Sequence, residues 1–336
     1  MNIARCMSEA GGAVGVSSSL VIGTRGSDLA LVQAEAVQSA LEASESMERR
    51  VERRIIKTTG DKRQDIRLSE IGGKAVDKGV FTKELEEALL AGEVDAAVHS
   101  LKDVPTEMDD RFVIAGVLPR AAVEDVLLMR SAGGLEELEE GAVVATSSLR
   151  RLRQLKFLRR DLEIVEIRGN VPTRIRKLMS GELGYDAIML ARAGLERLGY
   201  GGLESGALEF EGERIGVEVM DAKRFLPAAG QGIVGIETRA GDEETRVDIG
   251  GIGDGPAMVQ ARAERAFLEC LQAGCQTPVG VHSWVTGDRL WMRSRVFDEA
   301  DADGSAGTAP KSGEAVGSVM EPEAVAAALF ESLREE

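Results

Sequence analysis

The chain has 336 residues and a formal net charge of −16, with 43% apolar and 29% charged residues. This length allows two or three domains with sizeable cores, and the composition is typical of a soluble globular protein. No stretch approaches the roughly 18–20 consecutive apolar residues of a membrane-spanning helix. Three cysteines make no disulfide framework and two histidines show no zinc spacing, so we expect a reduced, metal-free protein of the cytoplasm.

The N-terminal third predicts a strand, a turn and a helix after an irregular start. Residues 1–18 lack the apolar core of a secretory signal, and we expect a disordered tail. Leu20–Thr24 then predicts a buried strand, followed by an apolar-periodic helix with Ser27 as its N-cap. This order directs backbone N–H groups and Arg25 at the space above the strand end, a favourable place for an anion. A plain N-cap with a solvent-facing arginine is the alternative.

Further strands and one helix complete this first α/β unit. We expect strands at Arg53–Thr58, Asp95–Ser100 and Phe112–Leu118, a loop at 62–80 and a helix at Phe81–Ala91. A loop of that length in a compact unit is often functional or disordered.

Lys102 and Asp103 directly follow one of these strands. Ligands of open α/β sheets bind beyond the carboxyl ends of the strands. A carboxylate there could stabilise a developing cation or move protons. The alternative is an ordinary aspartate in the turn before Pro105.

A second α/β unit begins near Glu124 and contains an island of positive charge. Residues 146–177 hold ten Lys or Arg and three Asp or Glu, so this window carries about +7 and the remainder about −23. Positive charge confined in this way indicates a bound anion, with a solvated cationic helix face as the alternative. We expect strands at Asp125–Met129, Ala142–Ala145, Glu163–Ile167 and Tyr185–Leu190.

Two helices in this window begin with arginines. After the cap at Thr146–Ser148, leucines at every third position from Leu149 to Leu158 predict a buried stripe. Arg150 and Arg151 in the first turn oppose the helix dipole, which indicates a bound anion. The next helix follows Arg168-Gly169-Asn170 and has Arg174 in its first turn. We therefore expect both helix starts to face one cleft.

The last third returns to a strand and then forms a final domain. Gly230–Gly235 matches G-x-G-x-x-G, but a strand and not a helix follows, so we interpret it as a hinge and not a dinucleotide site. Residues 241–255 predict a linker and residues 298–316 a loose loop. We expect a helix from Pro256, strands at Val279–Val285 and Arg289–Val296, and a closing helix at Glu321–Leu333. Cys275 lies in a Gly-flanked loop and could be a thiolate nucleophile or an inert thiol.

Seven stretches resemble the porphobilinogen deaminase family, in the family's order and over roughly residues 20–285. They are IGTRGSDLALVQAE, KTTGD, KGVFTKELEEALLAGEVDAAVHSLKDVPTE, ATSSLRRLRQLKFLRRDLEIVEIRGNVPTR, YDAIMLARAGLERLG, LPAAGQGIVGIETR and AERAFLECLQAGCQTPVG. The resemblance implies an α/β fold of three domains, with two lobes of the periplasmic-binding-protein type around a cleft. The expected divisions are 19–120 with 228–250, then 121–227, then a smaller α/β domain at 256–336.

The resemblance also implies a transferase. Such an enzyme condenses four porphobilinogen molecules on a dipyrromethane cofactor, held by a thioether to Cys275, and releases hydroxymethylbilane and ammonia. Asp103 corresponds to the catalytic aspartate. The binding positions correspond to Arg25, Ser27, Gln33, Asp61, Lys78, Phe81, Lys102, Thr146, Ser148, Arg150, Arg151, Arg168, Asn170, Arg174 and Gln231.

The chemistry of this family suits the residues. A six-ring chain carries about twelve carboxylates, which arginine forks match, and a carboxylate stabilises the azafulvenium cation left by loss of ammonia. The family's Gly-Gly-Lys-Gly-hydrophobic-Phe stretch is here GGKAVDKGVF, so Lys74 competes with Lys78, and the context of Gly79-Val80-Phe81 favours Lys78.

We expect porphobilinogen as the partner of a monomer, with neither membrane nor nucleic acid, because the chain is acidic and shows no nucleic-acid-binding module. A non-catalytic two-lobed anion-binding protein is the competing hypothesis, since a fold alone does not fix function.

Overall fold

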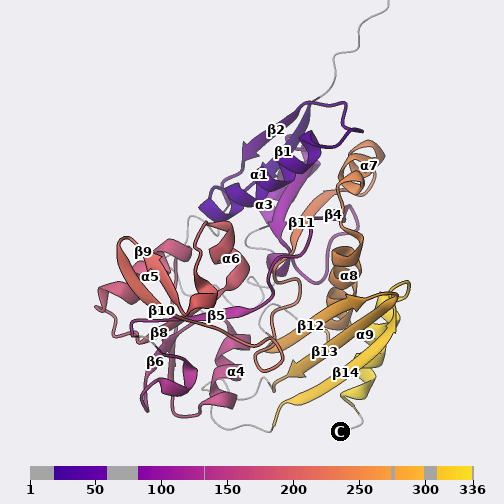
Figure 1. Cartoon of the computed structure of the whole chain (residues 1–336). Coiled ribbons are helices and arrows are strands. Elements are labelled where there is room, and N and C mark those ends of the chain that lie inside the picture. The colour runs from indigo at the N-terminus through magenta and orange to yellow at the C-terminus, as the bar shows by residue number, and fades with distance from the viewer. Residues whose placement is uncertain (1–18, 59–81, 132, 274–276, 299–308, 335–336) are drawn as a thin grey trace, which may run out of the picture.

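The computed structural model describes residues 19–58, 82–131, 133–273, 277–298 and 309–334. Its elements form two α/β lobes and a smaller C-terminal domain, as the sequence predicted (Figure 1). The expected N-terminal tail and the loop expected at 62–80 lie outside the described residues.

The first lobe is built on a five-stranded sheet with the order β2-β1-β3-β11-β4. β1 runs parallel to β2 and β3, whereas β11 runs antiparallel to β3 and β4. As predicted, a strand follows the Gly230–Gly235 motif, so this motif lacks the helix that a dinucleotide fingerprint opens. The elements of this lobe are β1 (Leu20–Thr24), α1 (Asp28–Glu42), β2 (Val51–Ile55), α3 (Lys83–Leu90), β3 (Ala96–Ser100), β4 (Phe112–Val117), β11 (Val234–Arg239) and α7 (Glu243–Gly251).

The second lobe has a six-stranded sheet with the order β7-β6-β8-β5-β10-β9. The β9–β10 hairpin was not predicted, and its turn holds Glu211 and Gly212 at positive φ, the geometry of a tight two-residue hairpin loop. The elements are β5 (Asp125–Met129), β6 (Val143–Ala145), α4 (Leu149–Leu158), β7 (Glu163–Val165), α5 (Val171–Ser180), β8 (Ala187–Ala191), α6 (Arg192–Arg197), β9 (Ala207–Phe210) and β10 (Glu213–Val219), with short 3₁₀ turns at Leu135–Glu137 and Leu203–Ser205.

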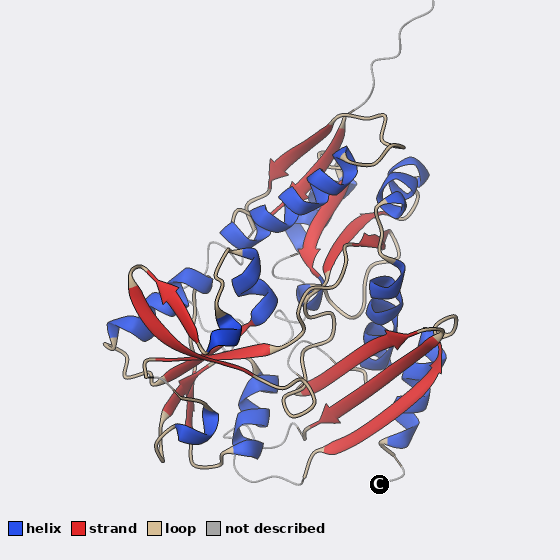
Figure 2. Ribbon diagram, in the orientation of Figure 1, coloured by secondary structure: helices blue, strands red, loops and turns tan. Residues whose placement is uncertain are grey.

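The C-terminal domain packs two helices against one face of a three-stranded antiparallel sheet (Figure 2). Phe267, Val281, Leu290 and Leu329 are fully buried between them. The elements are α8 (Gly255–Cys270), β12 (Val279–Thr286), β13 (Arg289–Val296), β14 (Lys311–Ser318) and α9 (Pro322–Ser332).

Two segments expected to be irregular contain regular elements among their described residues. The linker predicted at 241–255 contains α7, which Asp242 caps and which buries Ile249 in the first lobe. The loop predicted at 298–316 overlaps β14, whose inward positions include two glycines. A Cβ at Gly313 or Gly317 would lie 2.5 Å from a side-chain atom of α9, so close packing of this helix explains the weakly apolar strand.

Candidate active site

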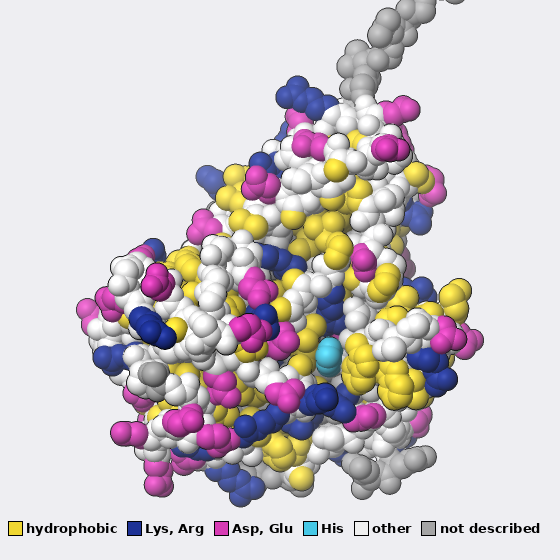
Figure 3. Space-filling view, viewed as in Figure 1, with side chains coloured by type: hydrophobic (Ala, Val, Ile, Leu, Met, Phe, Trp, Pro, Cys, Tyr) yellow, Lys and Arg dark blue, Asp and Glu magenta, His cyan; other side chains and the backbone are white. Residues whose placement is uncertain are grey.

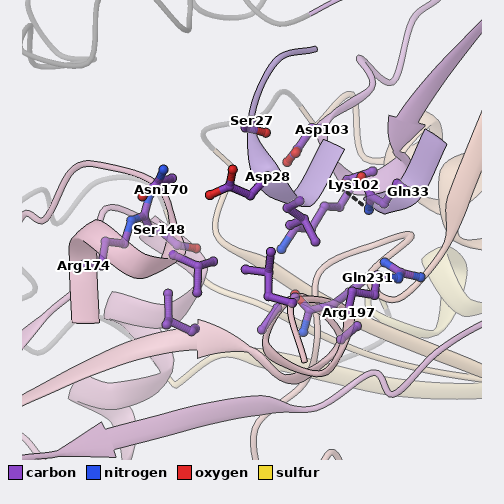
Figure 4. Close-up of a pocket in the computed structure, with 18 of the residues that line it drawn as sticks. Ser27, Asp28, Gln33, Lys102, Asp103, Ser148, Asn170, Arg174, Arg197 and Gln231 are labelled. Carbon is purple, nitrogen blue, oxygen red and sulfur yellow. Dashed lines mark hydrogen bonds between the residues drawn. The ribbon is translucent and has the colours of Figure 1, made fainter. Parts of the chain in front are cut away.

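A cavity of about 400 Å³ lies between the two lobes, where strand ends of both sheets meet helix starts. In the space-filling view, Lys and Arg side chains gather in the hollow where the lobes face each other (Figure 3). Asn170, Ser148 and Arg174 of the second lobe lie opposite Ser27, Asp103 and Lys102 of the first lobe (Figure 4).

The wall from the first lobe consists of two turns that follow neighbouring parallel strands. After β1, the hydroxyl oxygen of Ser27 accepts a hydrogen bond from the amide of Ala30 at 3.4 Å and caps α1, as predicted. One turn into α1, the buried Gln33 donates from Nε2 to Oγ of Ser100 at 2.8 Å. This bond fixes the end of β3, directly before the residues expected to do the chemistry.

Lys102 and Asp103 lie on a single 3₁₀ turn, Leu101–Asp103, that continues β3. Asp103 is exposed to the cavity, whereas Lys102 is half-buried. Burial lowers the pKa of Lys102 to about 8, although the adjacent Asp103 carboxylate acts in the opposite direction. The ammonium group is therefore charged at neutral pH and close to titration.

The wall from the second lobe is made by the starts of α4 and α5. Ser148 caps α4 by accepting from the amide of Arg151 at 3.4 Å, and Asn170 caps α5 by accepting from the amide of Thr173 at 3.0 Å. Gly169, directly before Asn170, has a φ of 116°, a conformation that glycine adopts readily. The two caps bring two helix N-termini to the cavity, as expected for an anion site.

Arginines supply most of the charge on this wall. Arg174 donates from Nε to the carbonyl of Gly169 at 2.7 Å. Burial, and then the nearby charges of Arg151 and Arg168, lower the pKa of Arg174 to about 10, whereas Asp103 raises it. Asp103 of the first lobe is thus close enough to interact electrostatically with the cationic wall of the second.

Helix α4 does not bury the leucine stripe that its sequence predicted. Only Leu155 of the four leucines is fully buried, while Arg150 and Arg151 are each 6% exposed. The reason is Asp125, a fully buried aspartate at the start of β5. Its carboxylate oxygens accept from Nη1 of Arg150 at 2.7 Å and from Nη2 of Arg151 at 2.8 Å. The arginines therefore occupy the inner face of the helix.

These two neighbouring arginines have different surroundings. Arg151 lines the cavity, whereas Arg150 donates to the carbonyl of Leu226 at 2.6 Å and is absent from the cavity lining. Burial alone would raise the pKa of Asp125, but the two guanidinium groups outweigh it and hold the pKa well below its usual range. Gln231 completes the cluster by donating from Nε2 to Asp125 at 3.1 Å.

The structure brings most of the predicted site residues together. Around the cavity lie Arg25, Ser27, Gln33, Lys102, Asp103, Thr146, Ser148, Arg151, Arg168, Asn170, Arg174 and Gln231. Arg150 is not among them, and Asp61, Lys78, its competitor Lys74, Phe81 and Cys275 lie outside the described residues.

Two residues at or beside this site were missed by the sequence analysis. Asp125 could have been found as the one charged residue that opens the strand DVLLM, whose residues are all buried. Arg197 lines the cavity and donates to the carbonyl of Gly232 at 2.6 Å, but an arginine near the end of an ordinary helix gives little signal.

Two functional classes receive no support from the described part of the chain. No group of three or more His, Cys, Asp or Glu in it could hold a metal ion. Among the same residues, no helix has the length and apolar character required to cross a membrane.

Comparison with known proteins agrees with this geometry. Residues 20–247 match the model of the porphobilinogen deaminase dipyromethane cofactor binding domain, and residues 258–334 match that of the porphobilinogen deaminase C-terminal domain. Porphobilinogen deaminase from Nitrobacter hamburgensis is 44% identical over 277 residues, 82% of each chain. That from Chlorobaculum parvum is 43% identical over 314 residues, 94% of each chain.

One of the solved structures similar to this chain is more distant. The methionine-binding protein MetQ shares 15% identity over 74% of this chain and 94% of its own, with a TM-score of 0.42, a similarity too weak to inform function.

The fold and cavity define a two-lobed α/β protein with a cationic cleft and a separate C-terminal domain. Family models over most of the chain and relatives above 40% identity narrow this class to one family. The chain belongs to the porphobilinogen deaminase family, whose members are transferases that use porphobilinogen and a dipyrromethane cofactor.

Replacing the buried carboxylate should destabilise the protein. In Asp125→Asn the two guanidinium groups lose their counter-charge, and we expect a loss of about 3–5 kcal/mol, measured as a lower Tm at neutral pH. Because the folded-state pKa of Asp125 is depressed, its stabilisation is complete above the ordinary value of 3.8 and is lost as pH falls below it. The Tm difference from wild type should therefore shrink in acid.

The control for this variant is Asp109→Asn, which breaks an exposed ion pair with Arg111 and should leave the Tm close to that of wild type. Equal Tm values for wild type and Asp125→Asn at neutral pH would contradict the organising role of Asp125.

Lys102 should set the alkaline limit of substrate binding. As pH rises through about 8, Lys102 loses its proton and the cleft loses a charge that attracts carboxylates, so KM should rise several-fold by about pH 9. Lys102→Arg should suppress this rise, because arginine remains protonated there. The measurement is KM against pH for both proteins, and an identical alkaline rise in the variant would refute the assignment.

Proposed function

We propose that this chain is a porphobilinogen deaminase that joins four porphobilinogen molecules head to tail on a covalent dipyrromethane primer. Its products are hydroxymethylbilane and ammonia. One observation carries the proposal: the Asp103 carboxylate faces a cavity whose two walls supply Lys102, Arg151, Arg168 and Arg174. A carboxylate set among cations suits a reaction in which a polyanionic substrate develops positive charge.

The residues around the cavity fit the dipyrromethane group. A pair of linked pyrroles offers ring N–H donors and carboxylate acceptors, so it needs partners of both kinds. The arginines and two helix N-termini supply donors for carboxylates. Asp103 is exposed and lines the cavity, so its carboxylate supplies an acceptor for the ring N–H groups.

Each group then has a defined task. The bound primer supplies a carbon nucleophile. Asp103 is the catalytic residue, and its carboxylate stabilises the positive charge that develops on the substrate's pyrrole as ammonia leaves. Lys102, Arg151, Arg168 and Arg174 bind the acetate and propionate groups and thereby orient each ring.

Arg150 does not line the cavity and acts on the ligand only indirectly. It shares the Asp125 carboxylate with Arg151 and so helps to hold that arginine at the cavity. This differs from the direct contact expected from the sequence.

The proposal includes the remaining expectations. Cys275 carries the primer, and Asp61, Lys78 in preference to Lys74, and Phe81 contribute to the same cleft. We place the domain divisions at 19–120 with 228–250, at 121–227 and at 256–336. We further propose a monomer located in the cytoplasm, since porphobilinogen is a small polar substrate and the chain is acidic.

An intact-mass measurement tests the proposal most directly. Wild-type protein from a host that makes porphobilinogen should exceed the sequence mass by two condensed pyrrole units, because the primer is covalent. Cys275→Ser should lack this excess and the activity. An unmodified and inactive wild type would favour the non-catalytic anion-binding protein.

The catalytic role of Asp103 has its own test. Asp103→Asn preserves the shape of the side chain but removes its charge, so we expect kcat to fall by about 10²-fold or more while the cofactor mass and Tm are retained. Asp110→Asn, at an exposed aspartate in the same connection, is the matched control. Near-normal turnover of Asp103→Asn would show that this carboxylate does not carry the reaction.

A further inference from the structure

The loop that follows Asp103 is held by the C-terminal domain. From α8, Nη2 of Arg265 donates to two successive carbonyl oxygens, that of Pro105 at 2.8 Å and that of Thr106 at 2.9 Å. Thr106 in turn donates from Oγ1 to the carbonyl of Ala273 at 3.2 Å, in the connection that follows α8. The loop is thus bound at two points to one short stretch of the C-terminal domain.

The turn that carries Lys102 and Asp103 also packs on the same helix. Leu101 and Val104, on either side of this pair, are buried in a cluster with Ala257 and Ala261 of α8. Helix α8 therefore contacts the turn through apolar side chains and the following loop through Arg265.

Helix α8 leads directly toward Cys275. Arg265 lies in its last two turns, and Ala273 is the last described residue before this cysteine in the chain. One helix thus contacts the backbone of the catalytic turn and precedes, by a few residues in the chain, the cysteine proposed to bear the primer. The reaction requires these two parts to hold a defined separation, because its reacting atoms must approach within bonding reach.

We infer that Arg265 is a positioning residue, which sets the Lys102–Asp103 turn against the primer-bearing segment through the carbonyl oxygens of Pro105 and Thr106. The inference rests on the proposed function of Asp103 and Cys275. Arg265 does not line the active cavity, so it acts through the loop and not on the substrate.

Burial explains why this contact can fix a position. Arg265 is partly buried, and this desolvation lowers the pKa of its guanidinium. Hydrogen bonds from a charged donor in such a place are stronger than those of an exposed pair. One guanidinium nitrogen that serves two carbonyls also restrains the direction of both peptide groups.

Arg262 provides a matched control. It lies one turn earlier on α8 and, together with Arg265, lines a groove beside β4. Unlike Arg265, Arg262 is exposed, and it pairs with Glu323 at 2.8 Å. Arg265→Met and Arg262→Met each remove one positive charge and two side-chain hydrogen bonds from the same helix. Only Arg265→Met releases the loop.

The experiment measures kcat, KM, Tm and intact mass for both variants and for wild type. For Arg265→Met we expect kcat to fall about 10- to 100-fold with KM within about threefold of wild type, since misplacement of a catalytic group by about 1 Å has effects of this size. The cofactor mass should be retained. Arg265→Lys, which can still donate to carbonyls, should recover part of kcat, and Arg262→Met should match wild type.

Each of the following results would overturn the inference. If folded, cofactor-loaded Arg265→Met keeps its kcat, or if Arg262→Met loses as much, Arg265 does not position the turn. Should Arg265→Met fail to fold, Thr106→Val removes only the bond to Ala273, and an unchanged kcat there would refute the coupling, whereas a several-fold loss would support it. A wild type without cofactor or turnover would instead contradict the proposed function itself.

Discussion

A single buried carboxylate, Asp125, organises the charge of the active cleft. Two guanidinium groups and the amide of Gln231 converge on it in a place with no solvent exposure. Isolated cations are costly to bury, but here the paired anion and backbone carbonyls accept hydrogen bonds from both arginines, although Nε of Arg150 has no partner among the described residues. Because Arg151 donates hydrogen bonds to Asp125, its side chain keeps a fixed direction along the cavity wall. The cleft can therefore present positive charge to a polyanion, because the pairing with Asp125 holds Arg151 in place.

A second buried carboxylate joins the three parts of the molecule. Glu264 of α8 accepts from both terminal nitrogens of Arg120 at 2.7 and 3.0 Å, from the amide of Gly230 at 2.7 Å and from Ser283 of β12. Arg120 and Gly230 belong to the two crossovers between the lobes. These crossovers pass so closely that a Cβ at Gly232 would lie 2.5 Å from the carbonyl oxygen of Ala121. The floor of the cleft is therefore tied to helix α8, which precedes Cys275 in the chain.

The distribution of charge follows from these contacts. The chain carries −16 overall, yet the charged residues that line its cleft are mainly cations from the window at 146–177 and from the first lobe. An acidic exterior with a basic cavity directs anionic substrates to one place. Other basic residues of the window have ordinary roles. Arg159, for example, pairs with Asp161 and donates to the carbonyl of Leu135 near the surface.

The sequence by itself determined most of the elements, two helix caps and the family, since apolar periods and the capping residues Ser27 and Ser148 are local signals. It also placed most of the twelve expected site residues that line the cavity at strand ends and helix starts, which the sheet topology gathers at one edge. Only the tertiary structure decided between Arg150 and Arg151. They are adjacent in one helical turn, and their directions depend on Asp125 and Leu226, which lie 25 and 76 residues from Arg150 in the chain. Helix α7 and strand β14 were missed for the same physical reason: their stability comes from packing against distant elements and not from local sequence.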